Sequence, residues 1–262
     1  MTFAYAALAV SLVMWLLWAR QCQTRNATSV DAAWALLIGA CALWFAVSGT
    51  GDPGRRALLG TLGALWGLRL GWHLIRDRVL GRAHAGEDGR YAAMRDHWGT
   101  RWALNFAWFY QAQAVMVLLF AAPFWWLAQD ARPLGTLADV VGVVWWVATL
   151  TLVWLADHQL ARWRADPATR GRTCRAGLWS WSRHPNYLGE WLHWLAWPLI
   201  AWGTPAMGGF LALAALLYVL LRFVTGIPWT ERRALATRPD YAAYQREVPM
   251  FFPWGRTSAP RT

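Results

Sequence analysis

The sequence GLWSWSRHPNYLGEWLHWLAWP at residues 177–198 decides how the whole chain is interpreted, because polar residues stand where an apolar, membrane-length segment begins. Pro185 suits the first turn of a helix, since its missing N–H would have no helical partner there. Pro185 also biases the preceding residue, His184, toward an extended backbone. We therefore expect a helix to begin at Pro185.

Polar side chains recur along one side of this expected helix. Asn186, Glu190 and His193 follow at i, i+4 and i+7, and Tyr187 lies three residues before Glu190. These spacings direct all four side chains toward one side. A carboxylate within a turn or two of the hydrocarbon costs a few kcal/mol unless it is paired or faces water, so Glu190 is a candidate functional residue. The structural alternative is an ion pair between Arg183 and Glu190, with His193 as an ordinary interior histidine.

Composition places the chain among integral membrane proteins. Of its 262 residues, 57% are hydrophobic and only 15% are charged, which is too apolar for an ordinary soluble domain. A helix crosses the hydrocarbon core with about 20 largely apolar residues. The sequence predicts an all-α, polytopic membrane helix bundle that forms a single domain over residues 1–262. We expect seven transmembrane helices, at 3–19, 30–48, 57–75, 103–128, 138–160, 187–203 and 207–224.

The arginines predict the orientation of this bundle. All 25 basic residues are arginines, and 21 of them lie in or near the segments that follow the first, third, fifth and seventh expected helices. Basic residues concentrate on the cytoplasmic side of membrane proteins. We therefore expect the N-terminus outside, the C-terminus in the cytoplasm, and the polar residues after these four helices at the cytoplasmic face.

The charge and the cysteine and histidine patterns indicate which partners to expect. The net charge of +11 resides mostly on one side, where anionic membrane lipids are natural partners. Nucleic-acid binding is not expected, because the arginines are spread over loops and no recognised nucleic-acid-binding motif occurs. No metal site is expected, because the six histidines lack ligand spacing. The three cysteines give no disulfide framework.

Ionisable residues in the second and third expected helices form a second candidate region. Asp31 lies at the start of the second helix, where either Ser29 or Asp31 could cap the N-terminus, and a functional role is the alternative. In the third helix, Arg69 and His73 lie on a polar stripe. Arg69 is about two turns inside the membrane and needs an anion, which could be Asp31, Glu190 or a ligand. Glycines at four positions between 60 and 71 would let this helix approach a neighbour closely.

The cytoplasmic segments concentrate groups that bind phosphates and amides. In the loop after the third expected helix, Arg90 and Tyr91 could cover a cofactor, and the alternative is an ordinary solvated loop. Asp157 and Arg164 lie seven residues apart on one helix face. Five closely spaced arginines from Arg164 to Arg183 exceed what orientation requires, and guanidinium groups suit phosphates.

These polar residues gather near one membrane face rather than at its middle. A transporter should carry polar groups at the midplane and often shows repeated halves, and we find no such repeat. The arrangement instead fits a cavity open to the cytosol at one end and to lipid at the other. A water-soluble phosphorylated cofactor and an apolar substrate would require such a cavity.

The motif GLWSWSRHPNYLGE, preceded by ADHQL and followed by TGIPWTER and YAAYQREVPMFFP, resembles the bacterial branch of the steroid 5-alpha-reductase-like membrane proteins. The RHPNYLG core is similar to that of the sterol C14 and C24 reductases. The resemblance covers residues from about 31 to 253. It implies a seven-helix reductase of the bacterial inner (plasma) membrane that takes NADPH from the cytoplasm without a Rossmann fold, and no strand followed by GxGxxG occurs here.

The resemblance also implies site residues. Asn186, Tyr187 and Glu190 would hold the nicotinamide end, with Glu190 bonding the carboxamide, and Asp157 and Arg164 with neighbouring arginines would hold the adenosine and phosphate end. The steroid enzymes carry a Gln-Glu pair in their second helix where this chain has Asp31. The predicted catalytic residues on the substrate side are Asp31, Arg69 and His73. The predicted cofactor-binding residues are Arg90, Tyr91, Asp157, Arg164, Arg172, Arg175, Arg183, His184, Asn186, Tyr187, Glu190 and Glu231.

The expected reaction is hydride transfer from NADPH to the beta carbon of an enone-like C=C bond in a lipid-soluble, steroid-like or isoprenoid-like substrate. Charge then develops on the carbonyl oxygen, so a donor should stabilise it and a proton must reach the alpha carbon. His73, a protonated Asp31 or Arg69 could be that donor.

Two alternatives stay open. The isoprenylcysteine-type membrane methyltransferases share an RHPxY motif and a downstream glutamate with this chain. In that case the residues that bind S-adenosylmethionine would be Arg183, His184, Tyr187 and Glu231. A non-enzymatic lipid-binding or assembly protein is the other class, and it would not need an inward-facing Glu190.

Overall fold

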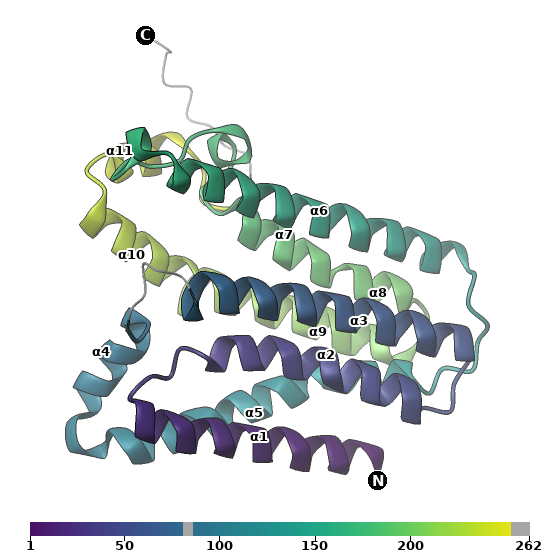
Figure 1. The fold of residues 1–262 in the computed structure, drawn as a ribbon. Helices are drawn as coiled ribbons and strands as arrows, with labels where there is room; N and C mark the ends of the chain where they lie inside the picture. Colours follow the sequence, from purple (N-terminus) through teal and green to yellow (C-terminus); the bar gives the residue numbers. More distant parts are fainter. Residues whose placement is uncertain (81–85, 253–262) are drawn as a thin grey trace. The chain divides into compact units, whose positions relative to one another are not determined.

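The computed structural model describes residues 1–80 and 86–252, and every regular element in these ranges is helical (Figure 1). The all-α prediction is therefore confirmed. Short π-helical turns at Ile75–Val79 and Leu220–Val224 extend α3 and α9. The α-helices are α1 (Thr2–Thr24), α2 (Val30–Ser48), α3 (Pro53–Leu74), α4 (Gly89–Trp98), α5 (Trp102–Leu127), α6 (Leu137–Ala165), α7 (Pro185–Trp194), α8 (Ala196–Ile200), α9 (Pro205–Val219), α10 (Ile227–Thr237) and α11 (Tyr241–Glu247).

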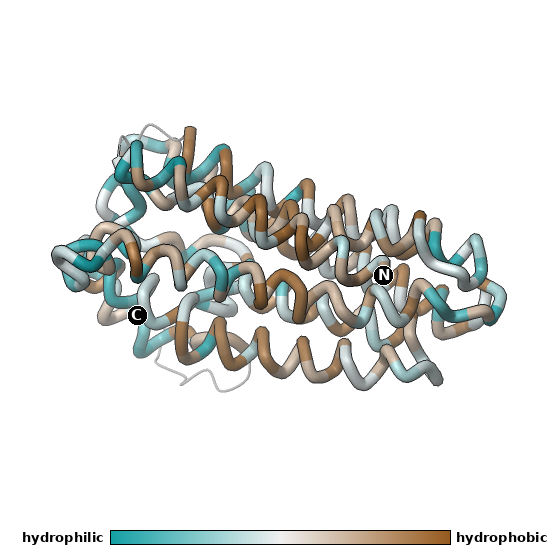
Figure 2. Tube along the Cα trace, turned by 90° about the horizontal axis from the view of Figure 1, so that it is seen from below, coloured by the Kyte–Doolittle hydropathy of each residue, from teal (hydrophilic) through white to brown (hydrophobic). Residues whose placement is uncertain are grey.

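Several helices have the length and composition that crossing a membrane requires. Hydrophobic residues lie along the middle of the long helices, and hydrophilic residues gather mostly near their ends (Figure 2). The chain is therefore an integral membrane protein, as predicted, while the number of spans and their orientation stay predictions. In the described part of the chain, five segments qualify as spans: Thr2–Thr24, Val30–Ser48, Gly89–Leu127, Leu137–Ala165 and Pro205–Thr237.

The two remaining expected spans are helical but differ from the prediction. The first corresponds to α3, which carries Arg55, Arg56 and Arg69 and is therefore less apolar. The expected helix 187–203 is divided between α7 and α8. Pro198 explains the break near Leu195, because proline has no N–H to bond the carbonyl four residues earlier and its ring clashes with that carbonyl.

The chain divides into two compact units, which we call unit 1 (Met1–Leu134) and unit 2 (Gly135–Thr262). Compact units of this kind occur both inside single domains and between domains. The single domain expected over residues 1–262 therefore stays a prediction. Each unit contains its own group of polar residues.

In unit 1, α2 and α3 pack side by side at very short distance (Figure 1). A Cβ atom added to Gly67 would lie 2.8 Å from the carbonyl oxygen of Ala35, and one added to Gly63 would lie 2.5 Å from the Cβ of Ala42. Any larger side chain at these positions would force the helices apart. The predicted role of the α3 glycines in close helix packing is therefore confirmed.

In unit 2, α6 packs against α7 and α8 through two further glycines. A Cβ atom on Gly189 would lie 2.8 Å from Cγ2 of Val153, and one on Gly142 would lie 2.6 Å from Cγ1 of Ile200. Gly189 lies in the second turn of α7, two residues after Tyr187. The close approach therefore brings the beginning of α7 next to the C-terminal half of α6, where Asp157 lies.

Candidate functional site

The helix predicted at Pro185 begins at that residue. His184 immediately before it has the non-helical backbone angles φ −138° and ψ 58°, and Pro185 occupies the first turn of α7. The proline restricts the residue before it to such a conformation. The non-helical backbone at His184 turns the chain before α7. The side chains of Ser182, Arg183 and His184 therefore point away from the axis of α7, toward the C-terminal segment of the chain.

Glu231 in α10 binds the side chains of this turn. Its Oε1 accepts hydrogen bonds from Nε of Arg183 at 2.7 Å and from Nε2 of His184 at 3.1 Å. Its Oε2 accepts a bond from Nε2 of Gln245 at 2.8 Å. Nη1 of Arg183 also donates to the backbone oxygens of Gln245 and Val248, at 2.9 and 2.7 Å. We call the group of Arg183, His184, Glu231 and Gln245 the Glu231 cluster.

The Glu231 cluster is nearly closed to solvent. Arg183 is 8% exposed and His184 3% exposed. Arg183 forms its ion pair with Glu231, which replaces the alternative in which Glu190 was its partner. Arg183 pairs with Glu231 because the chain folds back after α9. This brings the polar groups of α10 and α11 to the loop before α7. In this arrangement Arg183 and His184 hold that loop in place, and a cofactor would have to compete with Glu231 to bind them directly.

Burial is the main reason that the pKa of His184 lies below its ordinary value of 6.5, and the positive charge of Arg183 acts in the same direction. The Glu231 carboxylate opposes the shift but does not reverse it. His184 is therefore neutral near pH 7 and donates its Nε2 proton to Glu231. Its ring also stacks on Tyr187, with the ring centres 5.5 Å apart.

The depressed pKa of His184 predicts loss of stability on acidification. Between pH 6.5 and the lower folded-state pKa, the unfolded chain binds a proton at His184 that the folded protein does not. Stability should therefore fall as the pH decreases through this window, by at most about 1.4 kcal/mol per pH unit for this one proton. Thermal unfolding of detergent-solubilised protein between pH 8 and 5.5 measures the slope. We expect a flatter slope in His184→Gln, whereas the exposed His97→Gln should keep the parental slope. A parental slope in His184→Gln would contradict the prediction.

A second contact joins α6 to α7. Nδ2 of Asn186 donates a hydrogen bond to Oδ1 of Asp157 at 3.0 Å. Tyr187, the next residue, lies with its hydroxyl 3.4 Å from Oγ1 of Thr230 in α10. Glu190 lies one turn further along α7 and is half-buried. The predicted residues Asp157, Asn186, Tyr187 and Glu190 therefore share the region where α6 meets the start of α7.

A pocket of about 410 Å³ lies where α6 ends, and we call it the arginine pocket. It contains Arg164, Arg170 and Arg172, which belong to the arginine run predicted to suit phosphates, and Arg238, which was not predicted. A sequence signal for Arg170 existed in the arginine run, but none existed for Arg238, which arrives from the segment after α10. The lining residues are Leu160, Trp163, Arg164, Ala165, Asp166, Pro167, Thr169, Arg170, Gly171, Arg172, Cys174 and Arg238.

Arg175 belongs to a different environment from the other predicted arginines. Its guanidinium forms an ion pair with Glu247 in α11 and lies over the ring of Tyr244, 5.3 Å from the ring centre. It is not among the residues that line the arginine pocket. Arg175 thus connects the loop before α7 to α11, and the sequence could not indicate this because Glu247 lies 72 residues away.

In unit 1, Asp31 is the centre of a second polar group. Its Oδ2 accepts hydrogen bonds from Arg78 and from Nη2 of Arg90, the latter at 2.6 Å, and its Oδ1 accepts one from the Tyr91 hydroxyl at 2.5 Å. Ser29 is the N-cap residue of α2, but its side chain makes no capping bond. The capping role considered for Asp31 or Ser29 is therefore replaced by these longer-range contacts.

These contacts change the interpretation of Arg90 and Tyr91. Both were predicted to cover a cofactor, and both bind Asp31 within unit 1. Arg90 in addition pairs with Asp88, the N-cap residue of α4. The three hydrogen bonds that Asp31 accepts give it an architectural role in unit 1. Arg69 and His73 lie on α3 and are half-buried.

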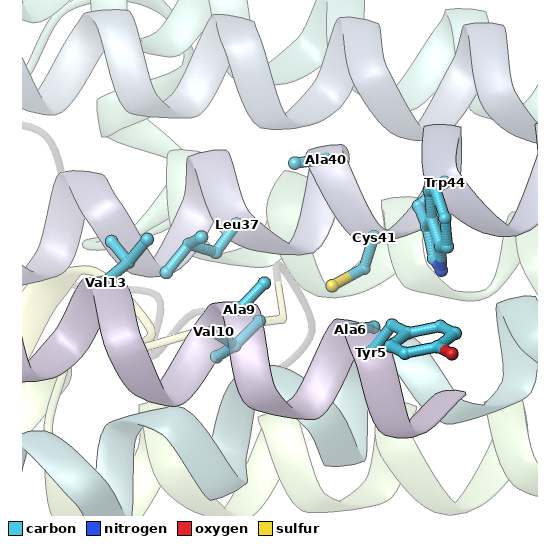
Figure 3. Close-up of a pocket in the computed structure, with 9 residues that line it drawn as sticks. All are labelled: Tyr5, Ala6, Ala9, Val10, Val13, Leu37, Ala40, Cys41 and Trp44. Atoms are coloured by element: carbon cyan, nitrogen blue, oxygen red, sulfur yellow. The ribbon is translucent and has the colours of Figure 1, made fainter. Parts of the chain in front are cut away.

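Unit 1 also contains an apolar groove of about 310 Å³ between α1 and α2 (Figure 3). The sequence analysis did not predict it, although small residues on both helices leave the space. Trp44 and Cys41 of α2 lie opposite Tyr5 and Ala6 of α1 in the view of Figure 3. The groove suits hydrocarbon, because its walls are almost entirely apolar. The lining residues are Tyr5, Ala6, Ala9, Val10, Val13, Leu37, Ala40, Cys41 and Trp44.

The fold and these clusters define an all-α integral membrane protein whose polar residues gather near helix ends. The chain belongs to the family described as "Protein of unknown function (DUF1295)", which it matches over residues 17–248. It is also similar to an uncharacterized protein, C594.04c, of Schizosaccharomyces pombe. The two are 28% identical over 265 residues, which cover 90% of this chain and 75% of the relative. No solved structure matches the chain.

Proposed function

We propose that this protein is a membrane reductase that uses NADPH to reduce an activated C=C bond of a lipid-soluble, steroid-like or isoprenoid-like substrate. It would act in the bacterial inner (plasma) membrane as a seven-helix protein with its N-terminus outside and its site facing the cytoplasm. The observation that carries the proposal is the hydrogen bond between Asp157 and Asn186, because it joins the α6 face that carries Arg164 to the α7 face that carries Glu190.

The spacing of two polar residues along α6 fits a bound dinucleotide. Asp157 and Arg164 are seven residues apart, which corresponds to about 10 Å along a helix axis. One end of this line meets Asn186 and α7, and the other end meets the arginine pocket. An elongated cofactor with an amide at one end and phosphates further along requires this order of groups. The motif resemblance to the steroid 5-alpha-reductase-like proteins supports the same assignment.

The residues of unit 2 would then have distinct roles. Asn186, Tyr187 and Glu190 would bind the nicotinamide carboxamide, and Arg164 and Arg172 would bind phosphates. Bound NADPH supplies the hydride that reduces the beta carbon and leaves as NADP⁺. The Glu231 cluster would act by positioning, since it fixes the loop from which α7 starts. Arg175 would do the same through Glu247.

The donor residues predicted for the substrate, Arg69 and His73, belong to α3. When a hydride adds to the beta carbon of an enone, the electron pair of the C=C bond moves toward the carbonyl oxygen, which needs a hydrogen-bond donor. We assign this donor to His73 or Arg69, and the alpha carbon takes its proton from an acid at the site. Asp31 would hold Arg90 and Tyr91 in place.

Methyl transfer from S-adenosylmethionine is the second candidate. The observation that favours it is the direct bonding of Arg183 and His184 to Glu231, since these are the residues shared with the isoprenylcysteine-type methyltransferases. The arginine pocket favours the reductase, because S-adenosylmethionine carries no phosphate for its arginines to bind. Affinity for the two cofactors therefore distinguishes the candidates.

Cofactor binding tests the proposal. We expect detergent-purified protein to bind NADPH and not S-adenosylmethionine, measured by calorimetry and by mass spectrometry of any retained nucleotide. Asn186→Ala and Glu190→Ala should each weaken NADPH binding about tenfold, because each removes a polar contact of about 1.4 kcal/mol.

Two variants control for general effects of the substitutions. Asn105→Ala in α5 and Asp96→Ala in α4 remove an amide and a carboxylate away from the proposed nicotinamide contacts, and both should bind NADPH like the parent. Parental NADPH affinity in Asn186→Ala and Glu190→Ala would refute the site assignment. Binding of S-adenosylmethionine without NADPH would replace the reductase by the methyltransferase.

A further inference from the structure

The arginine pocket holds more positive charge than its own acidic residues balance. Asp166 is the acidic residue of the lining, and its Oδ1 accepts the backbone N–H of Ala168, so it caps the short helical turn that follows α6. In the described part of the chain, the side chains of Arg170, Arg172 and Arg238 make no hydrogen bond or ion pair. These three guanidinium groups of the pocket therefore remain available to a ligand.

Two buried or half-buried arginines of unit 2, Arg175 and Arg183, show the opposite arrangement. Arg183 is paired with Glu231 and Arg175 with Glu247, so this unit supplies an acid where an arginine serves its architecture. In the arginine pocket, burial and then the charge of Arg164 lower the pKa of Arg238, which indicates that like charges repel one another there. An anion from outside the protein would relieve this repulsion.

The chemistry of the pocket specifies the kind of anion. A guanidinium group binds phosphate oxygens through two parallel hydrogen bonds. A phosphate monoester carries nearly two negative charges and three terminal oxygens at pH 7, whereas a diester carries one charge. Several converging arginines therefore suit a monoester best. A volume of about 410 Å³ lies within the usual range of small-molecule pockets, roughly 300–1,000 Å³.

We propose that the arginine pocket is a phosphate-monoester site in which Arg170, Arg172 and Arg238 bind the phosphate oxygens. Arg170 and Arg238 thereby acquire a role that the dinucleotide line along α6 did not assign. The identity of this monoester rests on the proposed function: it is the 2′-phosphate of NADPH. The pocket therefore selects NADPH over NADH. The other source of the same chemistry is a lipid with a monoester headgroup, such as phosphatidic acid.

The test uses full-length protein in detergent and compares Arg170→Gln/Arg238→Gln with Arg162→Gln/Arg232→Gln. The control pair loses the same charge from exposed positions outside the pocket. We expect the parent and the control to bind NADPH at least about tenfold tighter than NADH, and the pocket variant to lose this preference without weaker NADH binding. The single variant Arg170→Gln, at an exposed position, should lose part of the preference even if the double variant folds poorly.

A second readout does not depend on the reductase proposal. Adenosine 2′-monophosphate should raise the unfolding temperature of the parent and the control but not of the pocket variant, and adenosine should have no effect, because a ligand stabilises only the state that binds it.

Equal affinity of the parent for NADPH and NADH would overturn the selection by 2′-phosphate and leave the reductase intact. If neither nucleotide binds, the proposed function fails. Binding of phosphatidic acid or adenosine 2′-monophosphate then decides whether the pocket is a phosphate-monoester site. Stabilisation by phosphatidic acid in nanodiscs that is lost in the pocket variant would support a lipid-derived monoester, and no response to phosphatidic acid or adenosine 2′-monophosphate would overturn the site.

Discussion

Replacing Glu231 by alanine is expected to destabilise unit 2 by about 3 kcal/mol, because removal of one partner from a buried ion pair leaves the other charge uncompensated. The side chains of Arg183 and Glu231 are only 9% and 13% exposed. The variant also leaves His184 and Gln245 without their acceptor. The unfolding temperature in detergent should fall by roughly 10 °C.

The control for this prediction is Glu247→Ala, which breaks the ion pair between Arg175, in the loop before α7, and Glu247 in α11. Arg175 and Glu247 are 37% and 46% exposed at their side chains, so the loss should stay below about 1 kcal/mol. Equal destabilisation by the two variants would contradict the view that burial of the Glu231 cluster, and not charge pairing as such, holds the start of α7.

Replacing Asp31 by alanine should destabilise unit 1 by about 2 kcal/mol. Asp31 accepts the hydroxyl of Tyr91, which is only 3% exposed, and a buried donor without a partner costs about 1–3 kcal/mol. The variant also leaves Arg78 and Arg90 next to each other without the anion between them. Thermal unfolding in detergent measures the loss, and Asp96→Ala at an exposed position of α4 should change stability by less than about 0.5 kcal/mol.

Asp31→Asn separates charge from hydrogen bonding at this position. The amide oxygen can still accept the Tyr91 hydroxyl, but it carries no negative charge for Arg78 and Arg90. We expect a stability between those of the parent and Asp31→Ala. If Asp31→Asn were as stable as the parent, the native carboxyl would be neutral, and Asp31 would return as the protonated donor of the reduction.

The comparison of Asp31 and Glu231 shows how polar residues near helix ends serve two purposes in this protein. Each carboxylate binds at least three cationic or donor side chains that come from other parts of its own unit. Such clusters are part of the architecture. The arginine pocket differs because, in the described part of the chain, the side chains of Arg170, Arg172 and Arg238 make no hydrogen bond or ion pair, and this contrast is the reason for proposing a ligand site there.

The sequence by itself determined the features that depend on local stereochemistry and on hydrophobicity. Pro185 determined where α7 begins, the glycines of α3 determined how closely it could meet a neighbour, and the long apolar runs determined the all-α membrane class. Each of these follows from the shape of a residue, from spacing along one helix, or from the cost of exposing apolar surface to water.

Only the tertiary structure decided which charges meet. Arg183 and Glu231 are 48 residues apart, and Arg90 and Asp31 are 59 apart. Sequence spacing cannot choose among many arginines and acids when the partners lie on different elements, because ion pairs have no periodicity and form wherever packing brings two side chains together. The same holds for Arg238, whose place in the arginine pocket depends on how the chain returns after α10.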